Sequence, residues 1–115
     1  MTGRDEYEFE MERSNYTRAV HLAEEEGLGD EAIDAAQSAA FKQATGEHFN
    51  FRGAENLARS WDFTADKVAT LCNELLEDFE QREEAEGRTI KVFDIDKMDH
   101  VPVTKLISLF RDRYR

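Results

Sequence analysis

The stretch ENLARSWDFTADKVATLCNEL, from Glu55 to Leu75, decides how the rest of the chain is interpreted. It predicts a short helix, a tight turn and a longer helix that continues to Gly87. The longer helix carries apolar residues at i, i+3, i+4, i+7 and i+11, which is the spacing of a helix with one buried face. Those residues are Val68, Leu71, Cys72, Leu75 and Phe79. Two helices joined in this way either present a binding surface or only pack a core.

Residues 14–45 predict a further helical pair. Ser14 and Asp30 are suitable N-caps, and Gly27 and Gly46 are suitable C-terminal stops. The apolar positions at helical spacing are Tyr16, Ala19, Val20, Ala23, Ile33, Ala36, Ala40, Phe41 and Ala44. Many of these are alanines, so we expect two helices that approach each other closely.

The beginning of the chain has a different pattern. Tyr7, Phe9 and Met11 alternate with acidic residues over residues 1–13. Alternation of this kind predicts either a strand or a mobile N-terminal arm.

Two segments favour strands. Phe49 and Phe51 alternate with polar residues, and RTIKVFDI, residues 88–95, is rich in strand-forming residues. Because a lone strand is unstable, we expect these two segments to pair. Between Gly87 and Pro102 the sequence indicates one strand, not clearly two.

The last segment, residues 102–115, predicts a C-terminal helix. Its apolar stripe is Val103, Leu106, Ile107, Phe110 and Tyr114. A chain of 115 residues is about one domain. We therefore expect a single, mainly α domain of about five helices, with a central unit over residues 46–95 and a minimal two-stranded sheet.

The central unit resembles the helix-turn-helix superfamily over about residues 49–95. The superfamily pattern has a small residue in the first helix, which is Ala58 here, and a buried branched aliphatic residue in the second, which is Val68. Asp62 stands where the pattern prefers glycine, in a turn that requires a left-handed conformation, which Asp tolerates. The expected strands before and after the two helices resemble the order of a winged helix.

This resemblance implies that the second helix would enter the DNA major groove. The residues positioned to contact nucleic acid would be Arg59, Thr64, Lys67, Thr70 and Asn73. The charge opposes that function, because nucleic-acid affinity rests largely on neutralised phosphates. The net charge is −11, and residues 46–95 carry six basic against twelve acidic side chains. DNA-binding transcription regulation is therefore the alternative hypothesis, and an acidic protein that mimics DNA is a weaker one.

The favoured hypothesis is a non-catalytic regulatory or adaptor module that acts through protein–protein contacts. Residues 96–115 carry five basic and three acidic side chains, so the tail is the basic part of the chain. The residues expected to contact a protein partner or a second copy in a dimer are Phe110, Arg111, Arg113, Tyr114 and Arg115. No small-molecule substrate is indicated.

Neither catalysis nor a cofactor is expected. His21 and Glu25 lie four residues apart and could hold a metal on a helix face, but a surface pair is the simpler interpretation. The run DIDKMDH, residues 94–100, lacks the glycine and the terminal glutamate of a calcium loop. No phosphate-binding loop or serine nucleophile motif is present. We predict no catalytic, cofactor-binding or metal-ligating residues.

A cytoplasmic location is expected. The single cysteine, Cys72, excludes an internal disulfide and suits a reducing compartment. The first residues, MTGRDEYEFEMER, lack the features of a signal peptide, and no apolar run approaches the length of a membrane span.

Overall fold

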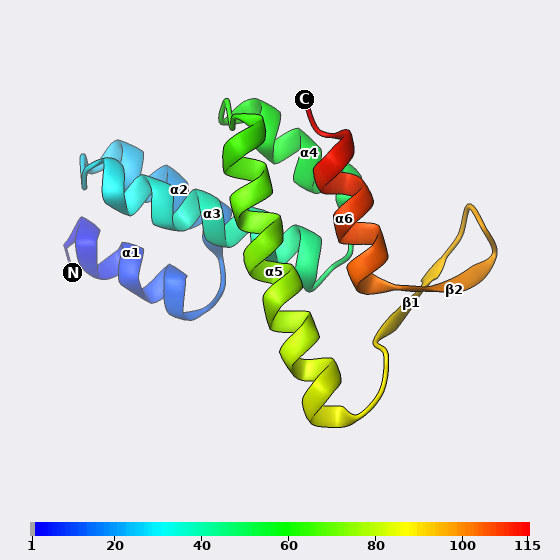
Figure 1. Ribbon diagram of the computed structural model, residues 1–115. Coiled ribbons are helices and arrows are strands. Elements are labelled where there is room, and N and C mark those ends of the chain that lie inside the picture. Colours follow the sequence, from blue (N-terminus) through cyan, green and yellow to red (C-terminus); the bar gives the residue numbers. More distant parts are fainter. Residues whose placement is uncertain (1) are drawn as a thin grey trace. The chain divides into compact units, whose positions relative to one another are not determined.

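The computed structural model describes residues 2–115, and Met1 lies outside the described residues. The described residues form six helices and one two-stranded antiparallel sheet (Figure 1). The mainly α class with a minimal sheet is therefore confirmed. The helices are α1 Gly3–Glu12, α2 Tyr16–Glu25, α3 Asp30–Gly46, α4 Phe51–Ser60, α5 Ala65–Glu86 and α6 Val103–Arg113, and the strands are β1 Lys91–Asp94 and β2 Asp99–Pro102.

The chain divides into two compact units, one that ends at Leu57 and one that begins at Ala58. The prediction of a single domain stays a prediction, because compactness does not decide whether two units unfold together. Within residues 2–115, no helix combines the length and the apolar character that a membrane span requires.

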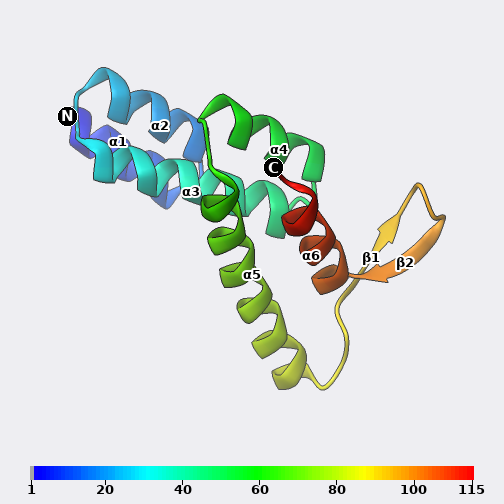
Figure 2. The same ribbon diagram turned by 45° about the horizontal axis from the view of Figure 1, so that its top comes forward.

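In the first unit, α1 packs on α2 and α2 packs on α3 (Figures 1 and 2). The predicted strand or mobile arm is wrong for Gly3–Glu12, because these residues form α1, and Met1 lies outside the described residues. Thr2 and Asp5 make a capping box: the Thr2 hydroxyl accepts the N–H of Asp5 at 3.2 Å, and the Asp5 carboxylate accepts the N–H of Thr2 at 3.3 Å. The hydroxyl of Tyr7 donates to the carbonyl of Ala32 in α3 at 2.8 Å. On a strand, the alternating apolar residues would share one buried face. Phe9 is instead 45% exposed, so the alternation did not reflect such a face.

The predicted helical pair is confirmed as α2 and α3, but both predicted N-caps are wrong. Ser14 has a φ of +61°, and Asn15 takes the cap position of α2. Gly29 is the N-cap of α3, and Asp30 is the first residue of that helix. Gly27 has a φ of +59° and ends α2, as predicted. Four alanines of the two helices are buried, namely Ala19, Ala23, Ala36 and Ala40. Their small side chains are what allow two helices to approach closely.

The predicted strand at Phe49 to Phe51 is wrong. Phe49 has a φ of +52°, which no strand contains. The Asn50 side-chain oxygen accepts the N–H of Gly53 at 2.9 Å, as an N-cap does, and α4 begins at Phe51. The pairing expected between this segment and residues 88–95 is therefore wrong as well.

In the second unit, α5 packs along α6 (Figure 1). All five residues of the predicted buried face of α5 are buried, and α5 ends as predicted before Gly87, which has a φ of +68°. β2, α6 and the C-cap residue of α6 also contribute to the core. The buried residues are Val101, Val103, Ile107, Phe110 and Tyr114. The predicted C-terminal helix is thereby confirmed.

The sheet is a hairpin rather than a pairing of distant segments. β1 pairs with β2, in a register that places Lys91 opposite Pro102, Val92 opposite Val101 and Asp94 opposite Asp99. Its base is tied to α5, because the carboxylate of Glu83 accepts the N–H of Ile90 at 3.0 Å. From this base the hairpin extends away from α5 and α6 in both views (Figures 1 and 2).

The Tyr7 hydroxyl gives a test of α1. Tyr7→Phe should lower the free energy of unfolding by about 1 kcal/mol, because the carbonyl of Ala32 loses a part-buried hydrogen bond. Urea unfolding followed by circular dichroism measures this. The control is Tyr16→Phe, whose hydroxyl donates to the Ser14 hydroxyl at 3.3 Å rather than to a main-chain carbonyl of another helix, and which should matter less. Equal effects of the two substitutions would contradict the docking of α1.

Candidate functional site

The turn between α4 and α5 contains the left-handed residue that the sequence predicted. Asp62 has a φ of +55°. The N–H of Phe63 donates to the carbonyl of Ala58 at 2.8 Å, and the N–H of Asp62 donates to that of Arg59 at 3.2 Å. These two bonds form a Schellman motif, which satisfies the last carbonyls of a helix. The prediction for Asp62 is therefore confirmed.

The start of α5 uses three of the proposed nucleic-acid contacts for its own structure. The Thr64 hydroxyl oxygen accepts the N–H of Lys67 at 3.0 Å and caps the helix. The Lys67 ammonium lies 5.6 Å from the centroid of the Phe63 ring. The Thr70 hydroxyl donates to the carbonyl of Asp66 at 2.9 Å. Only part of the hydrogen-bonding capacity of these side chains remains for a ligand.

Asn73, a further proposed contact, is bonded to α6. Nη1 of Arg111 donates to the Asn73 Oδ1 at 2.8 Å, and Nε of Arg111 donates to Asp112 at 3.0 Å. Asn reads adenine through its oxygen and its nitrogen together. Because the oxygen is engaged by Arg111, Asn73 would have to exchange that bond before it could read a base.

The end of the chain is attached to the turn. Nη1 of Arg59 donates to the carbonyl of Arg115 at 3.0 Å, and its guanidinium lies 4.6 Å from the centroid of the Tyr114 ring. The Tyr114 hydroxyl donates to the carbonyl of Phe63 at 2.8 Å. These contacts bring Arg59 together with residues that the sequence had assigned to a different surface.

The tail residues expected to meet a partner divide into two groups. Phe110 and Tyr114 are 2% and 4% exposed, so their rings belong to the core of the unit. Arg111 is partly exposed, and Arg113 and Arg115 are exposed. The surface that this segment offers is therefore mainly guanidinium groups.

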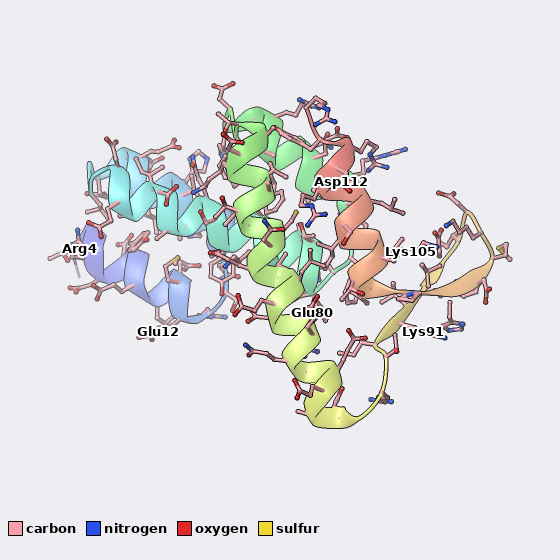
Figure 3. The ribbon with its side chains drawn as sticks, viewed as in Figure 1. Arg4, Glu12, Glu80, Lys91, Lys105 and Asp112 are labelled. Carbon is pink, nitrogen blue, oxygen red and sulfur yellow. The ribbon has the colours of Figure 1, made fainter. Side chains whose placement is uncertain are left out.

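The outward face of α5 is acidic. Figure 3 labels Glu80 on this helix and shows the side chains around it. The exposed acidic residues along α5 include Asp66, Glu74, Glu77, Asp78, Glu80, Glu84 and Glu86. A face of this charge repels a phosphate backbone.

The hairpin holds three of the four exposed large apolar residues of the second unit, which sequence reasoning missed. Phe93, Ile95 and Met98 are 50%, 76% and 72% exposed. On α6, Leu109 is 50% exposed. Three large apolar side chains within six residues of one projecting element form a surface that the α5 face does not offer. We call Phe93, Ile95 and Met98 the hairpin cluster.

A signal for the hairpin was present in the sequence. Asp94 Oδ1 accepts the N–H groups of Asp96 and Lys97 at 3.0 and 3.4 Å, which is how an aspartate starts a turn. The N–H of Met98 donates to the carbonyl of Ile95 at 3.3 Å, and Met98 has a φ of +53°. Residues 95–98 thus form the loop that separates the two strands.

Two aspartates of the run DIDKMDH, residues 94–100, accept main-chain hydrogen bonds of the hairpin. Asp94 begins the turn, and the Asp99 carboxylate accepts the N–H of His100 at 2.8 Å. Throughout residues 2–115, no three His, Cys, Asp or Glu side chains gather as metal ligands would.

Comparison of the chain with protein-family models, with curated proteins and with solved structures found no match. Function is therefore inferred from the residues described above.

The Asp62 conformation gives a test of the turn. Asp62→Val should destabilise the chain by about 1–2 kcal/mol relative to Asp62→Gly, because a β-branched residue resists a φ of +55° and glycine does not. Thermal and urea unfolding of the two variants measure the difference. Equal stability of both variants would contradict the turn described.

Cys72 gives a pH-dependent test. Burial raises the pKa of its thiol from 9.0 to about 11, and the Arg111 guanidinium opposes part of that rise. Below pH 9 the thiol is protonated in both folded and unfolded chains. Between pH 9 and 11 the unfolded chain loses the proton first, so this group should lower the stability as pH rises. Urea midpoints should fall more steeply with pH in the native chain than in Cys72→Ala, and parallel slopes would contradict the burial.

Proposed function

We propose that this chain is a non-catalytic regulatory or adaptor module that acts in the cytoplasm through protein–protein contacts, with the hairpin of β1 and β2 as its contact element. The observation that carries this proposal is the exposure of the hairpin cluster, Phe93, Ile95 and Met98. Aromatic residues and methionine are enriched in protein interfaces. Single exposed apolar residues are common, but a cluster on one projecting element is typical of a contact site.

Charge supports the same element. Residues 88–102 carry three basic and three acidic side chains, within a chain of net charge −11. Balanced charges add no net repulsion when the hairpin meets another surface, whereas a face of one sign favours only a partner of the opposite sign. The hairpin can therefore meet a wider range of protein surfaces than the acidic face of α5 can.

DNA-binding transcription regulation is the second candidate, and the order of the elements favours it. A helix, a left-handed turn, a longer helix and a β-hairpin follow one another, as they do in a winged helix. Against it stand the acidic residues of α5 and the internal bonds of Thr64, Thr70 and Asn73. The buried thiol of Cys72 is compatible with the reducing compartment in which either function would operate.

A position-resolved cross-linking experiment tests the protein-contact function. A photoreactive amino acid at Ile95, expressed in the source cells, should capture a defined partner. A photoreactive amino acid at Glu80, on the exposed face of α5, should not capture that partner. Met98→Asp should abolish the capture from position 95 without unfolding the chain, because Met98 is 72% exposed. Capture from position 80 alone would contradict the assignment to the hairpin.

Fluorescence anisotropy with random duplex DNA at low salt tests the second candidate. We expect no saturable binding, because the acidic face of α5 opposes the phosphate backbone. Tight binding that weakens steeply as salt is added would overturn the preferred function. In that case Arg59→Ala, compared with Arg82→Ala far along α5, would show whether the turn makes the contact.

A further inference from the structure

The two outer edges of the hairpin differ in their hydrogen-bonding groups. The N–H of Val103 donates to the carbonyl of Ile90 at 3.0 Å, so these residues form a hydrogen-bonded pair at the base of the hairpin. Hydrogen-bonded and non-hydrogen-bonded pairs alternate along an antiparallel ladder. Lys91 and Pro102 therefore form a non-hydrogen-bonded pair, and their main-chain groups point outward. The same holds two residues further along, for Phe93 and His100.

The outer edge of β2 has no available donor. Pro102 has no N–H, and the N–H of His100 donates to the Asp99 carboxylate at 2.8 Å. Proline is a device by which proteins prevent pairing at a sheet edge, and an N–H that is already bonded to a side chain is not available to another strand. The edge of β2 is therefore closed to another strand.

The outer edge of β1 is open. Its outward N–H and C=O groups belong to Lys91 and Phe93, and no group within residues 2–115 is hydrogen-bonded to them. Both residues are exposed, and Figure 3 labels Lys91 on this part of the hairpin. An edge with two donors and two acceptors in sequence is a template for a further strand.

We infer that the outer edge of β1 pairs with β1 of a second copy of this chain, so that two hairpins form one four-stranded antiparallel sheet. This inference rests on the proposed function, which makes the hairpin the contact element. Two copies of a chain with net charge −11 repel each other over most of their surfaces. Residues 88–102 carry equal numbers of basic and acidic side chains, so two hairpins can meet without net repulsion between them.

The sequence of β1 is complementary to itself in one register. With the two-fold axis at Val92, the outward groups of Lys91 meet those of Phe93 of the second copy, which gives about four main-chain hydrogen bonds. On the exposed face, each Lys91 ammonium then lies beside a Phe93 ring of the other copy. On the opposite face, Val92 meets Val92 and Asp94 meets Ile90. No like charges stand directly opposite each other.

Sedimentation velocity of the full chain over a range of concentrations tests this inference. The interface is small, so we expect a reversible dimer whose population rises with concentration. Phe93→Lys places a lysine opposite Lys91 of the other copy and should raise the dimer dissociation constant about tenfold. Lys91→Glu combined with Phe93→Lys places opposite charges there and should recover most of the affinity. Both side chains are exposed, so circular dichroism should show the same fold in every variant.

His100→Lys is the matched control, because it adds the same charge to the same face but on β2. It should leave the dimer unchanged. Val92→Cys should form an intermolecular disulfide under mild oxidation, since non-hydrogen-bonded cross-strand pairs bring Cα atoms to about 4.5 Å. Met98→Cys, at the loop, should cross-link much less. Cys72 is buried and common to all the variants.

A chain that stays monomeric at every concentration would overturn the inference. Equal dissociation by His100→Lys and Phe93→Lys would also overturn it, because the edge of β1 would then not be the interface. The photo-cross-linking experiment at position 95 measures capture of a different protein, and its result is independent of sedimentation. A monomer that still captures such a partner refutes the pairing of β1 and keeps the proposed function. A dimer that captures none keeps the pairing and refutes the adaptor role.

Discussion

The hydrogen bond from the Tyr114 hydroxyl to the carbonyl of Phe63 ties the end of the chain to the turn before α5. That turn depends on the left-handed conformation of Asp62, which allows α4 to end and α5 to begin within a few residues. Further along, the bond between Arg111 and Asn73 holds α6 against α5. Because α6 is fixed in this way, the strand β2 that leads into it is fixed too. The hairpin therefore has an anchored base and a projecting loop, which supports the proposal that it is a contact element.

Helix prediction succeeded where the apolar pattern was long and failed where it was short. The face of α5 from Val68 to Phe79 spans three turns, so the period of 3.6 residues is unambiguous. At Phe49 and Phe51 the alternation covers three residues, which a turn followed by a helix start satisfies as well as a strand does. In α1 the stronger signal was Thr2 with Asp5, a capping box that marks a helix start whatever the aromatic pattern suggests. The ends of a helix are set by hydrogen bonds between residues a few positions apart, so a short stretch of sequence can predict them. The partner of a strand can lie far away in the sequence and is harder to predict.

The candidate site was harder to predict than the fold, because residue type does not reveal whether a side chain is already engaged. Thr64 and Asn73 are suitable for base contacts by their chemistry, yet one caps α5 and the other accepts a bond from α6. Phe110 and Tyr114 are suitable for an interface by their size, yet both are buried. The exposure of Ile95 and Met98 depends on where a four-residue loop projects, which no helical or strand period encodes.

The two edges of the hairpin differ, since β2 is closed to a further strand and β1 is open. This difference bears on how the acidic surface affects contacts between copies. A two-stranded hairpin is only marginally stable in water, and its open edges invite non-specific pairing. Here β2 is closed by Pro102 and by the bond from His100 to Asp99, whereas β1 is left open. If the chain only had to avoid pairing, both edges would need such a device. The exposed acids of α5 repel the same face of other copies, whereas the hairpin carries balanced charges and adds no net repulsion. In the pairing proposed for β1, the charge that opposes DNA would also disfavour contacts between copies through α5, and the closed edge of β2 would leave β1 as the strand that pairs.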